Sequence, residues 1–206
     1  EDSDDKKKEK EKVKFEIFDT SGEKIRTFER TPSQDGINRT TWGLEMKGVS
    51  NPSRNKPRPN AQEPRGSTVL PGTYKVKISY GSYSDSTSVV VESDPRIDIP
   101  MSALRANLEL SNEVNALREK LAKSTAKLVE AKEIVEVAEN LAKADSRSKE
   151  ELKAVNEANK ATGKKIDELL DSIFGKRDDR QGITRNPDPT VMNQLSGPLR
   201  YMRNDF

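Results

Sequence analysis

"VKFEIFDTSGEKIRTF", from Val13 to Phe28, has the pattern of two strands joined by a tight turn. Apolar and charged residues alternate in its first segment, VKFEIF at 13–18, as they do in a strand with one buried face. The segment DTSG at 19–22 favours a turn, because Asp and Ser form local side-chain hydrogen bonds and Gly tolerates a positive φ. The segment EKIRTFE follows at 23–29. The stretch therefore predicts a β-hairpin at the start of a sheet.

Three more strands are expected downstream of this hairpin. They are GINRTTWGL at 36–44, the alternating residues Tyr74, Val76 and Ile78, and the valines at 89–91 after a turn-rich GSYSDSTS. Proline in the segment DPR at 94–96 ends the block, since proline cannot donate to a β-ladder. Short strands with frequent turns predict a small antiparallel β-sandwich over residues 13–97. Its expected core residues are Phe15, Ile17, Trp42, Tyr74 and Val76.

The composition changes beyond residue 97. No Gly or Pro occurs from Met101 to Ala144, which predicts one long helix. Its small and apolar residues recur at spacings of four and three, the pattern of a helix–helix seam. The expected seam residues are Leu110, Val114, Leu117, Leu121, Ser124, Leu128, Ala131, Val135, Ala138 and Ala142. The same seam fits either an intramolecular hairpin or a homo-oligomeric coiled coil, and a second helix with a matching seam favours the hairpin.

The second helix is expected to begin near a capping box formed by Ser148 and Glu151 and to end at Gly175. Its expected seam residues are Leu152, Val155, Thr162, Ile166, Leu169 and Ile173. A third, weaker helix is expected after Asp188, with Pro189 in its first turn and a kink or early end at Gly197-Pro198. Leu195, Leu199 and Met202 would face the helix pair.

The fold class is therefore expected to be α+β, with several domains in one chain. Residues 1–12 are a charged segment without apolar residues, which predicts a disordered linker to something upstream. The β-sandwich covers 13–97 and a long antiparallel helical hairpin covers 98–178. A C-terminal tail with a short third helix covers 179–206.

The overall composition excludes several function classes. The 206 residues include no cysteine and no histidine, so disulfides, thiolate metal sites and histidine-dependent catalysis are impossible. The net charge of +2 and the absence of a long apolar run give no reason to expect nucleic-acid binding or a membrane span. No phosphate-binding or calcium-loop motif is present, and carboxylate pairs fall one helical turn apart by chance at this charge density. We therefore expect no catalytic set, no metal site and no cofactor.

A basic, proline-rich stretch between two expected strands is the best candidate site. Its cationic residues are Lys47, Arg54, Lys56, Arg58 and Arg65. Four prolines favour an extended, semi-rigid course. Such a loop could be a structural crossing or a docking loop, or it could bind phosphate or an acidic glycan, and the crossing or docking role is favoured. Trp42 is expected in the core rather than on an exposed sugar-stacking surface. Tyr80 and Tyr83 flank a turn and are expected to be exposed.

Several segments together resemble a known module. FEIFDTSGEKIRTF, GINRTTWGL, VLPGTYKVKI and VVVESDPR are similar to the Ig-like module that follows the β-propeller in bacterial sortilin-like (VPS10/BNR-repeat) proteins. These proteins are often labelled glycosyl hydrolases, and the module also resembles the Ig-like domain of the flagellar hook-capping protein. The matching positions are Asp19, Gly22, Arg26, Asn38, Trp42, Pro71, Gly72, Thr73, Tyr74, Asp94, Pro95 and Arg96. The helical part and the NPDPTVMNQLSGPLRYM tail look like the family's usual continuation.

The resemblance implies a function that the residues alone do not give. It implies a non-catalytic accessory module that docks on and orients an upstream β-propeller, in the cell envelope, periplasm or secreted fraction. No residue of the propeller has a counterpart in this chain, so no catalytic residue is carried over. The alternative is a carbohydrate- or polyanion-binding module that uses the 47–65 loop, with Tyr80 or Tyr83 beside it. A hydrolase in its own right would need a pocket with converging carboxylates.

Overall fold

The computed structural model describes residues 11–56, 58, 61–147, 150–176 and 189–203, with backbone alone from 198 to 203. Within these residues the chain is α+β, with two antiparallel sheets and three helices, which confirms the expected fold class. It divides into two compact units. The sheet unit comprises residues 1–49 and 60–112, and the helical unit comprises 50–59 and 113–206. The chain therefore leaves the sheet unit after Val49 and returns to it at Asn60.

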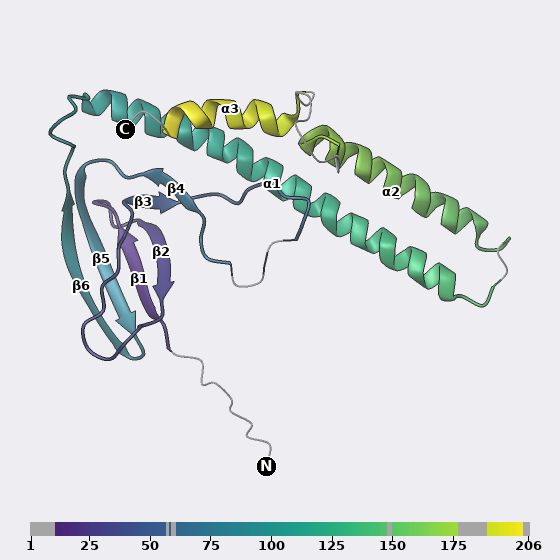
Figure 1. Cartoon of the computed structure of the whole chain (residues 1–206), viewed down its shortest axis with the longest axis horizontal. Coiled ribbons are helices and arrows are strands. Elements are labelled where there is room, and N and C mark those ends of the chain that lie inside the picture. The colour runs from purple at the N-terminus through teal and green to yellow at the C-terminus, as the bar shows by residue number, and fades with distance from the viewer. Residues whose placement is uncertain (1–10, 57, 59–60, 148–149, 177–188, 204–206) are drawn as a thin grey trace, which may run out of the picture. The chain divides into compact units, whose positions relative to one another are not determined.

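The sheet unit is built on four antiparallel strands in the order β2-β1-β5-β6 (Figure 1). They are β1 (Val13–Phe18), β2 (Lys24–Arg30), β5 (Gly72–Tyr80) and β6 (Tyr83–Val91). The expected first hairpin is confirmed. In its turn, Oδ1 of Asp19 accepts hydrogen bonds from the backbone N–H groups of Ser21 and Glu23, both at 2.9 Å. Gly22 takes the positive φ of 83° that the turn requires.

One hydrophobic core lies between this sheet and a two-stranded sheet formed by β3 (Glu45–Lys47) and β4 (Arg65–Thr68). Phe15 and Phe28 stack at 4.9 Å between ring centroids, and Ile17 is fully buried beside them. Trp42 meets Tyr74 edge-on at 5.6 Å, an arrangement that aromatic quadrupoles favour. Buried members of the core are Phe15, Ile17, Phe28, Val69, Tyr74 and Val91, with Val13, Ile25, Trp42, Met46 and Val76 packed against them.

The prediction of a strand at 36–44 is wrong. No strand forms there, and the third strand begins only at Glu45. The amide of Asn38 explains the loop, because it accepts from the N–H of Ser33 at 3.0 Å and donates to the carbonyl of Gln34 at 2.8 Å. Asparagine side chains that bond nearby backbone compete in this way with a β-ladder. Leu44, with a φ of 56°, then redirects the chain into β3.

The last strand is longer than expected. The polar segment taken as a turn is part of β6, which pairs with β5 without interruption from Tyr83 to Val91. The turn is reduced to Gly81 and Ser82. Gly81 has a φ of 56°, and Ser82 is not among the positive-φ residues, as in a type II′ turn, whose twist matches that of the flanking strands. β4 was not expected at all, because its RGST sequence lacks an apolar alternation.

Three helices contribute to the second part of the chain: α1 (Met101–Ala144), α2 (Lys153–Phe174) and α3 (Val191–Arg203). The bounds of α1 agree with the stretch that lacks Gly and Pro, although its first residues up to Asn112 belong to the sheet unit. Lys132 pairs with Asp167 at 2.6 Å, and Gly163 lies against the side chain of Val135. Residue numbers rise along one helix as they fall along the other, so the pair is antiparallel, as a hairpin requires (Figure 1).

The helical seams are displaced by one residue in places. Ser111 and Thr125 are buried where Leu110 and Ser124 were expected, and Leu117 is exposed. On α2, Leu170 is buried and Leu169 is exposed. The other expected seam residues of α1, from Val114 to Ala142, are buried or partly buried. Of the other residues expected on the second seam, Leu152, Ile166 and Ile173 are buried, whereas Val155 and Thr162 are exposed. The period of the seam is therefore as expected, but which of two neighbouring residues is buried is not.

The observed ends of the helices agree only in part with those predicted from the sequence. Gly175 ends α2 with a φ of 84°, as expected. However, α2 begins later than expected, after the residues of the expected capping box, with Leu152 at its N-cap and no side-chain cap. Ser148 itself lies outside the described residues. At α3, Oγ1 of Thr190 accepts the N–H of Asn193 at 3.1 Å and acts as the N-cap. The helix continues through Gly197-Pro198 to Arg203.

Candidate functional site

The basic connection between β3 and β4 consists of two segments that belong to different units. Residues 50–59 are part of the helical unit, and residues from 60 onward are part of the sheet unit. The cationic residues of the connection are divided accordingly. Arg54, Lys56 and Arg58 lie in the first segment, whereas Lys47 and Arg65 lie in the sheet unit, paired in register across β3 and β4. The five cations therefore do not belong to one compact unit.

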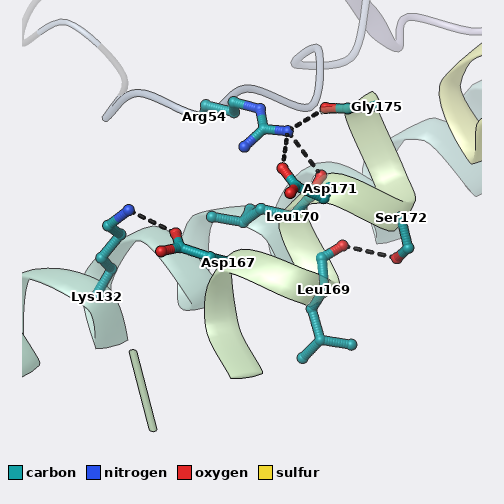
Figure 2. Close-up of polar contacts among 8 residues, drawn as sticks. All are labelled: Arg54, Lys132, Asp167, Leu169, Leu170, Asp171, Ser172 and Gly175. Atoms are coloured by element: carbon teal, nitrogen blue, oxygen red, sulfur yellow. Dashed lines mark hydrogen bonds and ion pairs between the residues drawn. The ribbon is translucent and has the colours of Figure 1, made fainter. Parts of the chain in front are cut away.

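Arg54 is the best-anchored residue of the first segment. Its Nη2 donates to the carbonyl of Gly175 at 2.6 Å, to Oδ1 of Asp171 at 2.9 Å and to the carbonyl of Leu170 at 3.2 Å. Figure 2 shows these three oxygens gathered around the guanidinium at the end of α2. The guanidinium also lies 5.2 Å from the ring centre of Phe174, within cation–π range. Only 19% of the Arg54 side chain is exposed.

The sequence of α2 explains why an external cation is held there. The last carbonyls of a helix lack intrahelical partners and carry partial negative charge, which a basic residue in the last turn usually offsets. The last turn of α2 contains no basic residue, and Asp171 adds a full negative charge. Arg54 donates to the carbonyl of Leu170 in the last turn and to that of Gly175 just past it, and it pairs with the carboxylate of Asp171. The loop therefore supplies the cation that the last turn of α2 lacks, although Arg54 and Asp171 are 117 residues apart in the sequence.

The neighbours of Arg54 attach the same segment to α1. Oδ1 of Asn51 accepts a hydrogen bond from Arg118, and Lys56 forms an ion pair with Glu133. Arg118 and Glu133 are 15 positions apart, roughly 22 Å along a helix. Five residue steps of extended chain reach about 17 Å, and the side chains span the rest. The segment must therefore run nearly extended along α1, as its prolines favour. Pro52 is buried in this course.

The second segment is bonded to the sheet. Oε2 of Glu63 accepts the N–H of Thr27 in β2 at 2.9 Å, and Oε1 lies 3.4 Å from Nζ of Lys47. Arg26 is buried and donates from Nη1 to the carbonyl of Pro64, while its buried Nε has no hydrogen-bond partner among the described residues. Arg65 is far more open, with a 3.4 Å ion pair to Glu45 and a side chain that is 79% exposed.

The remaining candidate residues do not gather around the loop cations. Arg58 is exposed, with no hydrogen bond or ion pair to any residue that the structure describes. Trp42 is half-buried in the core, and its indole N–H donates to the carbonyl of Glu45 at 2.9 Å. Tyr80 and Tyr83 face each other across the β5–β6 turn and are exposed, as expected. Trp42 is therefore a core side chain and not an open stacking platform.

The sequence alone did not identify the acceptors of these cations. Asp171 and Glu63 are ordinary carboxylates in a chain rich in them. One feature of the sequence did point to Asp171. An acidic last turn without a basic residue leaves the negative charge at a helix C-terminus without a cation to offset it. Nothing comparable marks Glu63.

A hollow of about 630 Å³ lies at the turn end of the α1–α2 hairpin. Its lining includes two carboxylates, Asp145 and Glu157, among four cations. The guanidinium of Arg147 binds Asp145 at 2.6 Å and lowers the pKa of that carboxyl to about 2. Asp145 is therefore an ion-pair partner of Arg147 in this hollow.

Within the described ranges no group of three or more acidic residues is placed to hold a metal ion. No described helix combines the length and apolarity needed to cross a membrane. No protein-family model, curated protein or solved structure matches the chain.

Proposed function

We propose that this chain is an accessory interaction module, which docks on and orients a domain that precedes it in the same protein. The observation that carries the proposal is an apolar row on α1 formed by Ile134, Val137 and Leu141. These side chains are 65%, 57% and 67% exposed. Their spacing of three and four residues puts them on one helical face. Grouped exposed apolar side chains are typical of protein–protein contact sites.

The internal ion pairs of the basic loop support contact through this apolar row. Arg54 and Lys56, which could have met an external anion, are paired within the helical unit. Releasing Arg54 would leave Asp171 and two helix-end carbonyls without their cation, which opposes its use by a ligand. The free surface of the helical unit therefore offers an apolar row in preference to a basic loop.

The identity of the partner rests on the resemblance of the strand motifs to the module of sortilin-like proteins. In those proteins a β-propeller precedes the module, so the proposed partner is an upstream β-propeller. The same resemblance supports a location in the cell envelope, in the periplasm or outside the cell.

Calorimetry with two separate proteins tests the proposal. The region encoded before Glu1 and the present chain are produced apart, and their association is titrated. We expect binding, and we expect Ile134→Glu to weaken it about tenfold or more, because a charge would be buried at the contact. Leu117→Glu is the matched control, since Leu117 is also exposed on α1 but on another face.

Two results would contradict the proposal. One is a reading frame with no folded domain before this chain. The other is full-strength binding by the Ile134→Glu variant, which would remove the row from the interface.

The alternative function is binding of a glycan or an anionic polymer through the 47–65 loop. Its one supporting observation is the exposed Arg58. Titration with heparin or dextran sulfate tests it, with Arg58→Ala as the variant. Salt-sensitive binding that Arg58→Ala reduces would favour this function over domain docking.

A further inference from the structure

The two edges of the four-stranded sheet differ in how their backbone groups are satisfied. At the β2 edge, Glu63 accepts the N–H of Thr27, and the carbonyl of Pro64 accepts the side chain of Arg26. Glu63 therefore satisfies one outward backbone group of β2, and the segment at 63–64 is bonded to that strand. At the opposite edge, β5 is the only strand that pairs with β6 among the residues described (Figure 1). An uncovered edge presents a row of unpaired N–H and C=O groups.

The turn between β5 and β6 fixes which groups point outward from β6. In a two-residue hairpin the closing pair, here Tyr80 and Tyr83, exchanges both backbone hydrogen bonds. The backbone N–H and C=O groups of the odd-numbered residues of β6 then point toward β5. Those of Ser84, Ser86, Ser88 and Val90 point outward. The N–H of Ser86 agrees with this assignment, because it donates to Oδ1 of its neighbour Asp85 at 2.7 Å instead of to β5.

β6 lacks the features with which natural edge strands avoid pairing. Such features are lysines, prolines, bulges and short length. The nine residues YSDSTSVVV contain no Lys or Pro and a single charge, at Asp85. All nine pair with β5 without a register shift. Tyr83 is 80% exposed, and Val90 is exposed as well.

We propose that β6 pairs antiparallel with β6 of a second copy of this chain, around a two-fold axis at Thr87. This register sets Ser86 opposite Ser88 of the second copy and Ser84 opposite its Val90. Each of these pairs exchanges both backbone bonds, so all outward N–H and C=O groups from 84 to 90 are satisfied. The two four-stranded sheets then form one continuous sheet.

The strand is self-complementary in this register. Asp85 lies opposite Val89 of the second copy, and Tyr83 lies opposite Val91, an aromatic–β-branched pair that stabilises sheets. The two copies of Asp85 are four residues apart along the strands, roughly 13 Å. That separation exceeds the screening length of about 8 Å at physiological salt, so their repulsion is weak. The carboxylate of Asp85 must release the N–H of Ser86, which the carbonyl of Ser88 of the second copy then binds.

Sedimentation equilibrium of the full chain is the first test. We expect a concentration-dependent dimer. Ser86→Lys should weaken it about tenfold or more, because two lysines would stand diagonally about 7 Å apart across the axis. Ser86→Thr, which keeps the polarity and suits a strand, should leave the dimer intact.

Cross-linking tests the register itself, since the natural chain contains no cysteine. Thr87→Cys places two thiols opposite each other on the axis, at a Cα separation that a disulfide accommodates. Ser84→Cys is the control, with its two thiols six residues apart, roughly 20 Å. We expect Thr87→Cys to cross-link at least about ten times faster than Ser84→Cys. A monomer throughout the micromolar range, or equal cross-linking at both positions, would overturn the proposal.

Discussion

The two segments of the β3–β4 connection use the same residue types in different ways. In the first segment, Arg54 is largely buried and bonded to three oxygens at the end of α2. In the second, Arg65 has one 3.4 Å ion pair and a mostly exposed side chain. What an arginine contributes is therefore set by the oxygens that the fold gathers around it. Basic composition alone did not distinguish the anchor from the solvated residue.

The largest expected effect comes from removing the anchor. Arg54→Ala should destabilise the helical unit by about 2–3 kcal/mol, because it leaves Asp171 and two part-buried carbonyls without their donor. Urea unfolding followed by circular dichroism at 222 nm reports the helices. Fluorescence of Trp42, the single tryptophan, reports the sheet unit. We expect the helical transition to shift more than the Trp42 transition.

Arg65→Ala is the matched control for this comparison. Its exposed ion pair should contribute no more than about 0.5 kcal/mol, as is usual for surface pairs. Equal destabilisation by the two substitutions would contradict the distinction between the segments.

A smaller effect is expected in the second segment at Glu63. Glu63→Ala removes the acceptor of the Thr27 N–H and the ion pair with Lys47, and should cost the sheet unit about 1 kcal/mol. Glu63→Gln keeps a side-chain oxygen for Thr27 and should retain most of that stability. The Trp42 transition in urea measures both variants. An unchanged midpoint in Glu63→Ala would show that this segment does not hold the edge of β2.

Acid should lower the stability of the sheet unit through Glu16. We expect this effect to be smaller than those of Arg54→Ala and Glu63→Ala. A side-chain hydrogen bond from Lys24 lowers the pKa of Glu16 below its ordinary 4.5, with desolvation opposing it and Lys14 adding to it. The charged carboxylate therefore stabilises the fold above pH 4.5, and this contribution is lost as pH falls through the lowered pKa.

Glu16→Gln isolates this contribution from those of other carboxylates. The stability difference between the natural chain and Glu16→Gln should be present near neutral pH and shrink below pH 4.5. The Trp42 transition, measured in urea across that range, checks it. A difference that grows on acidification would reverse the sign and contradict the assignment.

The local features of the fold could be predicted from sequence where one signal dominated. The hairpin of β1 and β2 follows from strict alternation and an Asp-Ser-Gly turn. α1 follows from a long stretch without Gly or Pro. β6 was underestimated because Ser, Thr and Asp also indicate turns, and a solvated edge strand tolerates them. The strand expected at 36–44 failed because the side chain of Asn38 binds the nearby backbone.

The candidate site could be predicted only in part. Proline and arginine indicated an extended loop that docks, and the first segment does lie on helices. Its acceptor could not be predicted, because Arg54 and Asp171 meet through a long-range contact that no local pattern encodes. The off-by-one seams have a similar origin, since the facing helix decides which of two neighbouring residues is buried.

Hydrogen exchange in the natural chain and in Arg54→Ala most directly tests whether Arg54 anchors its loop to the end of α2. The N–H of Gly175, which donates to the carbonyl of Asp171 at 2.8 Å, reports that helix end. We expect Arg54→Ala to lose protection at the last turn of α2 while the amide of Thr27 in β2 keeps its own. Unchanged protection at Gly175, or equal loss at both amides, would contradict the anchor.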